Sequence, residues 1–151
     1  MGFTGVVVTT LPFVPRDEEA FRAELARLGI PSVEEDPSCS GLVWQKRENG
    51  YWFGGRVLTL DVEVPDDVDP SGAVDLVEVL QEHIKPGTVF ACESVAHEGL
   101  SSVSAWVCVV TEDKVLQGEL EGIAAALLSV AKSAPAGCRS QGERRFGCGR
   151  C

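Results

Sequence analysis

Residues 42–55 read LVWQKRENGYWFGG and predict a β-hairpin. Two runs rich in β-branched and aromatic residues flank Asn49-Gly50, and both of these residues tolerate the positive φ of a type I′ turn. The first strand is expected over residues 42–47. The second is expected from residue 51 to residue 64, because residues 58–64 alternate between apolar and polar side chains. Gly54-Gly55 predicts a bulge or bend within this second strand.

The remaining elements follow from the same kinds of pattern. Residues 3–10, 88–96, 102–111 and 115–118 predict strands. Apolar residues at helical spacing predict one helix that opens at residues 15–19 and stops at Gly29, and two more over residues 73–84 and 119–133. Two hairpins separated by helices indicate an α+β fold. We expect a mostly antiparallel sheet of five or six strands, with three helices packed mainly on one face.

The domain boundary is predicted at Pro135. Residues 1–134 are expected to form a single α+β domain, and residues 135–151 a flexible tail with one large apolar residue, Phe146. The tail holds four of the 13 Lys and Arg residues but only one of the 23 Asp and Glu residues. The tail is therefore basic, and the body carries the negative charge of a chain whose net charge is −10.

Composition limits the partners and the compartment. An acidic body repels nucleic acid and anionic lipid, so neither a nucleic acid nor a membrane is expected to bind it. The apolar runs are too short to span a bilayer, and the first residues lack the pattern of a secretory signal. We therefore expect a cytoplasmic protein, whose six cysteines act as thiols or metal ligands rather than as a disulfide framework.

The tail cysteines are the candidate metal ligands. Cys138, Cys148 and Cys151 follow the spacing C-x9-C-x2-C, and the last two are close enough to bind one tetrahedral zinc ion. A structural zinc site has four ligands, so Cys39, His97 or a second chain would have to supply the fourth. The other interpretation, in which no cofactor is bound and the thiols are incidental, stays open.

Strand alternation predicts a semi-apolar outer face of the sheet. If the apolar side of residues 58–64 faces the helices, alternation directs Tyr51 and Phe53 outward. It likewise directs Glu93 and His97 outward and Cys92 inward, so that a Cys–His dyad is not expected. The aromatic residues near the hairpin could instead pack the core. The partner-binding candidates are Trp44, Tyr51, Phe53, Glu93 and His97.

A run within residues 73–115, "DLVEVLQEHIKPGTVF…SAWVCVVTEDKV", resembles a group of small actinobacterial and actinophage proteins of unknown function. These proteins share an opening Met-Gly-aromatic strand, as in Met1-Gly2-Phe3 here, and a helix followed by a Pro-Gly turn and a strand pair. The resemblance implies a phage or accessory-genome protein. It carries no activity and no functional residues.

No motif for nucleotide binding, for a nucleophile elbow or for a zinc protease occurs in the sequence. We therefore expect a non-enzymatic binding, adaptor or inhibitor protein, which acts through a sheet face, an edge strand or its acidic surface and could form a homodimer. Two alternatives stay open. One is a small hydrolase or transferase that uses carboxylates or a metal, and the other is an acidic DNA mimic that inhibits a nucleic-acid-binding protein.

Overall fold

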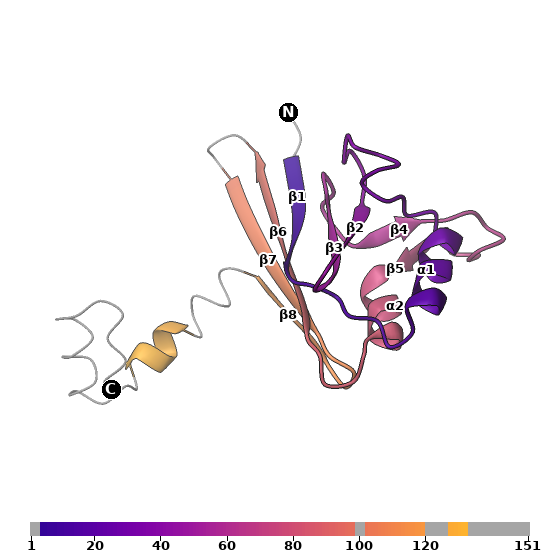
Figure 1. Cartoon of the computed structure of the whole chain (residues 1–151). Helices are drawn as coiled ribbons and strands as arrows, with labels where there is room; N and C mark the ends of the chain where they lie inside the picture. The colour runs from indigo at the N-terminus through magenta and orange to yellow at the C-terminus, as the bar shows by residue number, and fades with distance from the viewer. Residues whose placement is uncertain (1–3, 99–101, 120–126, 133–151) are drawn as a thin grey trace. The chain divides into compact units, whose positions relative to one another are not determined.

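The β-branched and aromatic runs form a six-stranded antiparallel sheet. Its strands are β1 (Thr4–Leu11), β2 (Val43–Arg47), β3 (Gly50–Gly55), β6 (Phe90–Glu98), β7 (Ser102–Val110) and β8 (Val115–Glu119). Their order in the sheet is β2-β3-β1-β6-β7-β8 (Figure 1). This computed structural model describes residues 4–98, 102–119 and 127–132. The chain divides into two units, residues 1–118 and 119–151.

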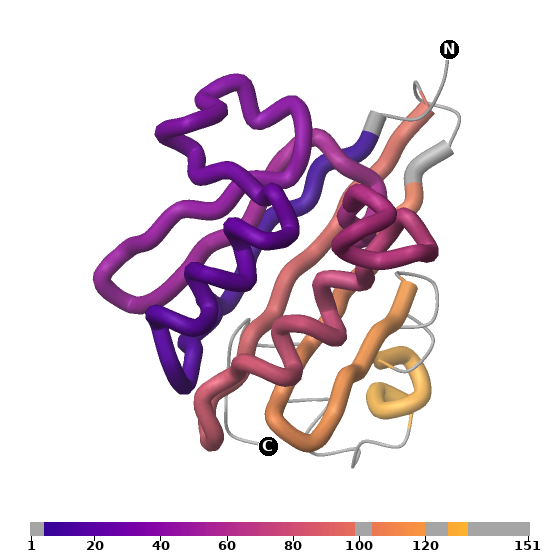
Figure 2. The backbone as a smooth tube through the Cα atoms, turned by 90° about the vertical axis from the view of Figure 1, so that its right-hand side faces the viewer, coloured from indigo at the N-terminus to yellow at the C-terminus, as the bar shows by residue number. Residues whose placement is uncertain are grey.

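Two helices cover one face of this sheet (Figure 2). In α1 (Glu18–Arg27) the Asp17 carboxylate caps the first turn by accepting a hydrogen bond from the Ala20 amide at 3.0 Å. Phe21, Leu25 and Leu28 are buried, as the helical spacing predicts. In α2 (Leu76–His83) the buried residues are Leu76, Val77, Val79 and Leu80. The α+β prediction is therefore confirmed.

The predicted second helix begins three residues too early. Residues 73–75 form the strand β5 (Ala73–Asp75), which pairs with β4 (Asp61–Glu63) in a separate two-stranded sheet. The Asp75 side chain accepts a hydrogen bond from the Val77 amide at 2.9 Å, which fixes Asp75 as the N-cap of α2. The helix therefore cannot extend back to Ala73.

The second strand of the hairpin is shorter than predicted. β3 ends at Gly55, whose φ of 147° suits glycine and whose missing side chain lets the backbone pass Gly41 closely. The Arg56 amide then donates to the Cys39 carbonyl at 3.0 Å, and the chain leaves the sheet. The predicted bend at Gly54-Gly55 is thus a strand end, and the alternating residues that follow belong to β4 and its approach.

The hairpin turn lies one residue earlier than predicted. Arg47 pairs with Gly50, so the connecting residues are Glu48 and Asn49. Among the described residues only Cys39 combines a side chain with a positive φ, so the type I′ prediction for Asn49 is wrong. Gly50 is needed for another reason, because a β-carbon there would lie 2.5 Å from the Phe13 carbonyl oxygen.

Aromatic rings fill the space between the sheet and α1. Rings from the described segments pack with centroids 4.6 to 6.5 Å apart, and the set includes Phe13, Phe21, Tyr51, Phe53 and Phe90. Tyr51 is 0% and Phe53 3% exposed, so the prediction that both point to the outer face is wrong. The break after Gly55 is the cause, because the alternation of residues 58–64 does not continue across it.

The second unit contains the end of the predicted third helix. Residues 127–132 are helical, whereas Glu119, the predicted start of that helix, ends β8. Leu127 and Val130 are 64% and 66% exposed. The boundary predicted at Pro135 and the tail after it lie outside the described residues.

Candidate binding surfaces

One face of the six-stranded sheet carries neither α1 nor α2. On β1 the side chains of Val7 and Thr9 point to the core, whereas Val6 and Val8 are 42% and 47% exposed on the other side. On β6, Val95 is 43% exposed in the same way. We call this side, which bears Val6, Val8 and Val95, the open face.

Strand register extends the open face to the neighbouring strands. Residues directly opposite each other in an antiparallel pair share a face. Glu93 lies opposite Val8 on one side and Val107 on the other, while Val95 lies opposite Val6 and Ala105. Glu93 and His97 are exposed, as predicted. Cys92 is buried on the other side of the sheet, which separates it from His97.

The aromatic candidates lie on the helix-covered side instead. Trp44 lies opposite Phe53, is half-buried, and donates from its indole Nε1 to the Ile30 carbonyl at 3.1 Å. Its ring lies 5.3 Å from the Arg22 guanidinium of α1 and 5.6 Å from the Tyr51 ring. The structure thus brings Trp44, Tyr51 and Phe53 together, but away from Glu93 and His97.

A shallow hollow of about 420 Å³ interrupts the open face between β1, β3 and β2. Gly54, which has no side chain, lies opposite Val8 and lines this hollow. Val6, Val8, Val43 and Trp52 supply apolar walls, and the charged residues of the lining are Arg47 and Arg56.

Charge therefore changes sign across the open face. The β2–β3 side carries Arg47, whose guanidinium lies 4.7 Å from the Trp52 ring, and Arg56. The β6 side carries Glu93. The valines of β1 separate the two, since β1 lies between β3 and β6. Sequence reasoning missed Arg56 and the hollow, and the Gly54-Gly55 pair was their only signal.

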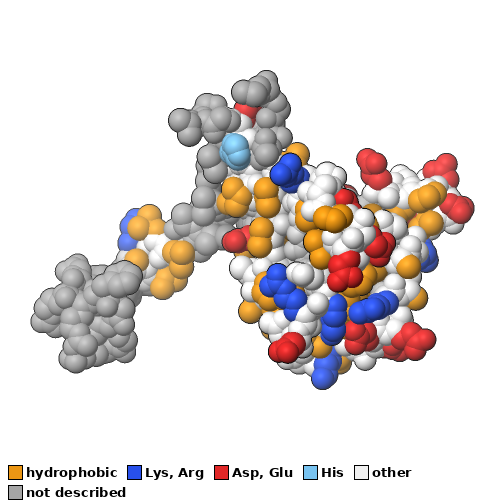
Figure 3. All heavy atoms as spheres, turned by 45° about the horizontal axis from the view of Figure 1, so that its top comes forward, with side chains coloured by type: hydrophobic (Ala, Val, Ile, Leu, Met, Phe, Trp, Pro, Cys, Tyr) orange, Lys and Arg blue, Asp and Glu red, His pale blue; other side chains and the backbone are white. Residues whose placement is uncertain are grey.

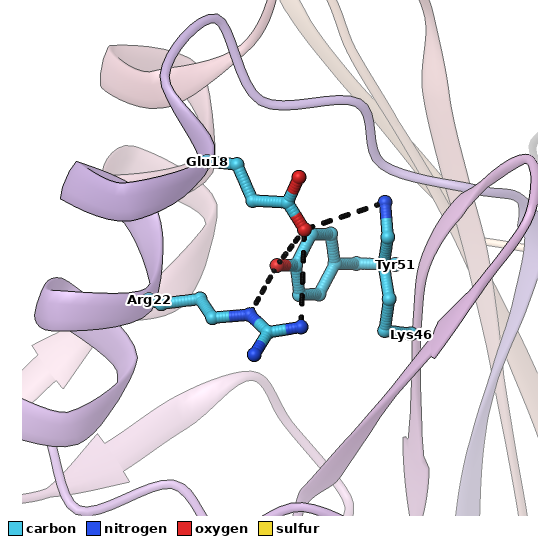
Figure 4. A network of polar contacts seen from close by, with 4 residues as sticks. All are labelled: Glu18, Arg22, Lys46 and Tyr51. Atoms are coloured by element: carbon cyan, nitrogen blue, oxygen red, sulfur yellow. Dashed lines mark hydrogen bonds and ion pairs between the residues drawn. The ribbon is translucent and has the colours of Figure 1, made fainter.

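A polar network on the other side joins α1 to the hairpin (Figure 4). The Tyr51 hydroxyl donates to Glu18 Oε1 at 2.9 Å and accepts from Arg22 Nε at 2.8 Å. Lys46 Nζ lies 3.5 Å from the same Glu18 oxygen. The hydrogen bond from Tyr51, aided by Lys46 and Arg22, lowers the pKa of Glu18. Burial raises the pKa of Tyr51. Each member has a partner, so the network serves to position α1.

A second hollow, of about 340 Å³, lies beside the two-stranded sheet. Trp106 and Gln117 line it together with two aspartates, Asp61 and Asp75, which lie directly opposite each other on β4 and β5. Within the described ranges, no group of three or more His, Cys, Asp or Glu side chains is placed to hold a metal ion. The predicted zinc ligands Cys138, Cys148 and Cys151 lie outside those ranges.

Acidic side chains are spread over the surface visible in Figure 3, and basic side chains lie among them. In the part of the chain that the structure describes, no helix is long and apolar enough to cross a membrane. The chain matches no protein-family model, no curated protein and no solved structure.

Proposed function

We propose that the chain is a non-enzymatic binding protein, that the open face is its interface, and that a second copy of the chain occupies this face. The observation that carries the proposal is the row of valines, Val6, Val8 and Val95, each more than 40% exposed beside the hollow at Gly54. Contiguous apolar surface of this kind marks interaction sites, and most soluble oligomers are two-fold dimers.

Charge complementarity favours a second copy over an unrelated partner. A two-fold axis parallel to β1 would lay the valines of one copy on those of the other. It would also place the β3 side of each copy over the β6 side of its partner. Arg56, which follows β3, would then lie over Glu93 of the partner subunit, and the two pairs would form symmetrically. The hollow at Gly54 would receive apolar side chains from the opposing sheet.

Sedimentation equilibrium in the micromolar range tests the proposal, with the full chain under reducing conditions. The wild type is expected to sediment with twice the mass of one chain. Val8→Asp should shift it to monomer, because the substitution buries two unpaired carboxylates at the centre of the interface. Ala23→Asp is the matched control, since it adds the same charge to the exposed side of α1 and should leave the dimer intact.

A charge exchange tests the orientation of the two copies. Arg56→Glu and Glu93→Arg should each weaken dimerisation, because each places like charges opposite one another. The double variant should restore it. Circular dichroism on each variant verifies that the monomer still folds. A monomeric wild type throughout the micromolar range refutes the homodimer, and a dimer that the Val8 variant does not affect refutes this interface.

A further inference from the structure

Two buried thiols face each other on neighbouring strands. Cys92 of β6 and Cys108 of β7 are directly opposite in the strand register, and both are 0% exposed. Both belong to the core on the helix-covered side of the sheet. Directly opposite residues of an antiparallel pair share a face, so the two side chains are neighbours in this core.

The backbone spacing of such a pair suits a disulfide. Directly opposite residues of antiparallel strands have Cα atoms about 4.5 Å or about 5.5 Å apart, depending on the hydrogen-bonding position. Disulfides span Cα separations of about 4.4 to 6.8 Å, so both positions fall within the allowed range. The register therefore places the two residues within the range of backbone separations that disulfides span.

We propose that Cys92 and Cys108 are a reversible redox site, which a peroxide converts into a disulfide across β6 and β7. Neither residue belongs to the open face, so this site is independent of the proposed dimer. The proposal concerns a pair of facing thiols at a fixed position in the sheet, and hydrogen peroxide is the oxidant that it requires. A small thiol such as dithiothreitol is the reductant that reverses it.

The chemistry balances in two steps. The thiolate of one of the two cysteines attacks one oxygen of hydrogen peroxide, and the O–O bond breaks to give a sulfenic acid and, after proton transfer, one water. The sulfur of the other cysteine then attacks the sulfenyl sulfur, the S–O bond breaks, and the hydroxyl leaves with the proton of the attacking thiol as a second water. Two thiols are oxidised, and one peroxide is reduced to two waters.

The two thiols face each other in the same core, so either sulfur can form the nucleophilic thiolate while the other resolves the sulfenic acid. Burial of both makes the reaction slow, since the oxidant must enter the core or wait for a local opening.

Peptide mapping tests the site directly in the full chain. The tryptic peptide 57–114 contains no other cysteine, because Lys85 precedes a proline and no other basic residue lies between Arg56 and Lys114. After treatment with millimolar hydrogen peroxide and alkylation in denaturant, this peptide should have lost two hydrogen atoms and carry no alkyl group. Dithiothreitol should restore two alkylatable thiols. Cleavage after glutamate separates Cys92 from Cys108 and should yield them as a linked pair.

Two variants and one stability measurement complete the test. Cys39→Ala should form the bond like the wild type, whereas Cys108→Ala should leave Cys92 as a free thiol. The oxidised wild type should melt about 5 °C higher than the reduced one, because the bond restricts the unfolded chain. Two alkylated cysteines in the peroxide-treated peptide overturn the proposal. So does oxidation that stops at sulfinic acid on either residue.

Discussion

Replacing Thr9 by valine should destabilise the fold far more than a change of one surface group would. The Thr9 hydroxyl donates to the Phe53 carbonyl at 2.8 Å and accepts from the Phe53 amide at 2.8 Å. Regular pairing between β1 and β3 is confined to Val7–Gly55 and Val8–Gly54. The Thr9 hydroxyl therefore takes the place of a main-chain partner for Phe53, the next residue of β3. Thr9 is 3% exposed, and water cannot easily replace it.

The expected magnitude follows from the two main-chain groups that lose their partner. Valine has nearly the same shape but leaves the Phe53 N–H and C=O buried without a hydrogen bond, at about 1–3 kcal/mol for each group. Thr9→Val should therefore lower the free energy of unfolding by about 2–6 kcal/mol, a large part of the 5–15 kcal/mol that is roughly typical of a domain.

Urea denaturation followed by tryptophan fluorescence measures this loss, and two neighbouring substitutions serve as controls. Thr9→Ser keeps both hydrogen bonds and removes one methyl group, which should cost about 1 kcal/mol. Thr10→Val changes the exposed neighbour on the other side of β1 and should stay within about 0.5 kcal/mol of the wild type. A Thr9→Val variant as stable as Thr9→Ser would refute the role given to the hydroxyl.

Two further predictions concern the hairpin and its polar network. Gly50→Ala should lower the free energy of unfolding by at least about 2 kcal/mol, because the new methyl group would lie 2.5 Å from the Phe13 carbonyl oxygen. Gly87 also has a positive φ, but no atom beyond its chain neighbours lies within 4 Å of the position that a β-carbon would take there. Gly87→Ala should therefore lower the free energy of unfolding by less. The hydrogen bond from Tyr51, with the cations beside it, holds the pKa of Glu18 below its ordinary 4.5. The stability that this carboxylate contributes is therefore present above pH 4.5 and lost as the pH falls through the lowered pKa. Unfolding free energies measured across this range should show a smaller slope for Glu18→Gln than for the wild type, and equal slopes would contradict the assignment.

Patterns confined to a few consecutive residues predicted the elements well. The β-branched run at β1, the helical spacing of Phe21, Leu25 and Leu28, and the long strands β6 and β7 all stand where the sequence indicates. Each of these signals is local, because it depends on the periodicity of one segment against the core. The short strand β8 was also predicted, with an end one residue earlier than the observed one.

The predictions were wrong where the structure of a segment depends on its contact with another segment. Residues 73–75 have helical spacing but pair with β4, because Asp75 caps the helix behind them. Residues 58–64 alternate like a strand of the main sheet, yet only Asp61–Glu63 form a strand, and its partner is β5. Neither outcome is contained in the periodicity of one segment, since each depends on a contact between segments.

The candidate surface shows why polar residues locate a sheet face better than apolar ones. Val6, Val7 and Val8 are the same residue type, yet only Val7 faces the core. The sequence of this run therefore does not show which of the three valines is buried. On β6, Glu93 and His97 are exposed and alternate with less exposed residues, and their predicted exposure is what the structure has. Val8 lies directly opposite Glu93 in the pairing of β1 with β6, so both side chains lie on the same side of the sheet. This pairing shows which valines are exposed. Burying a charged side chain costs free energy, whereas a valine can occupy either side of a sheet. The exposed residue Glu93 therefore identifies the open face.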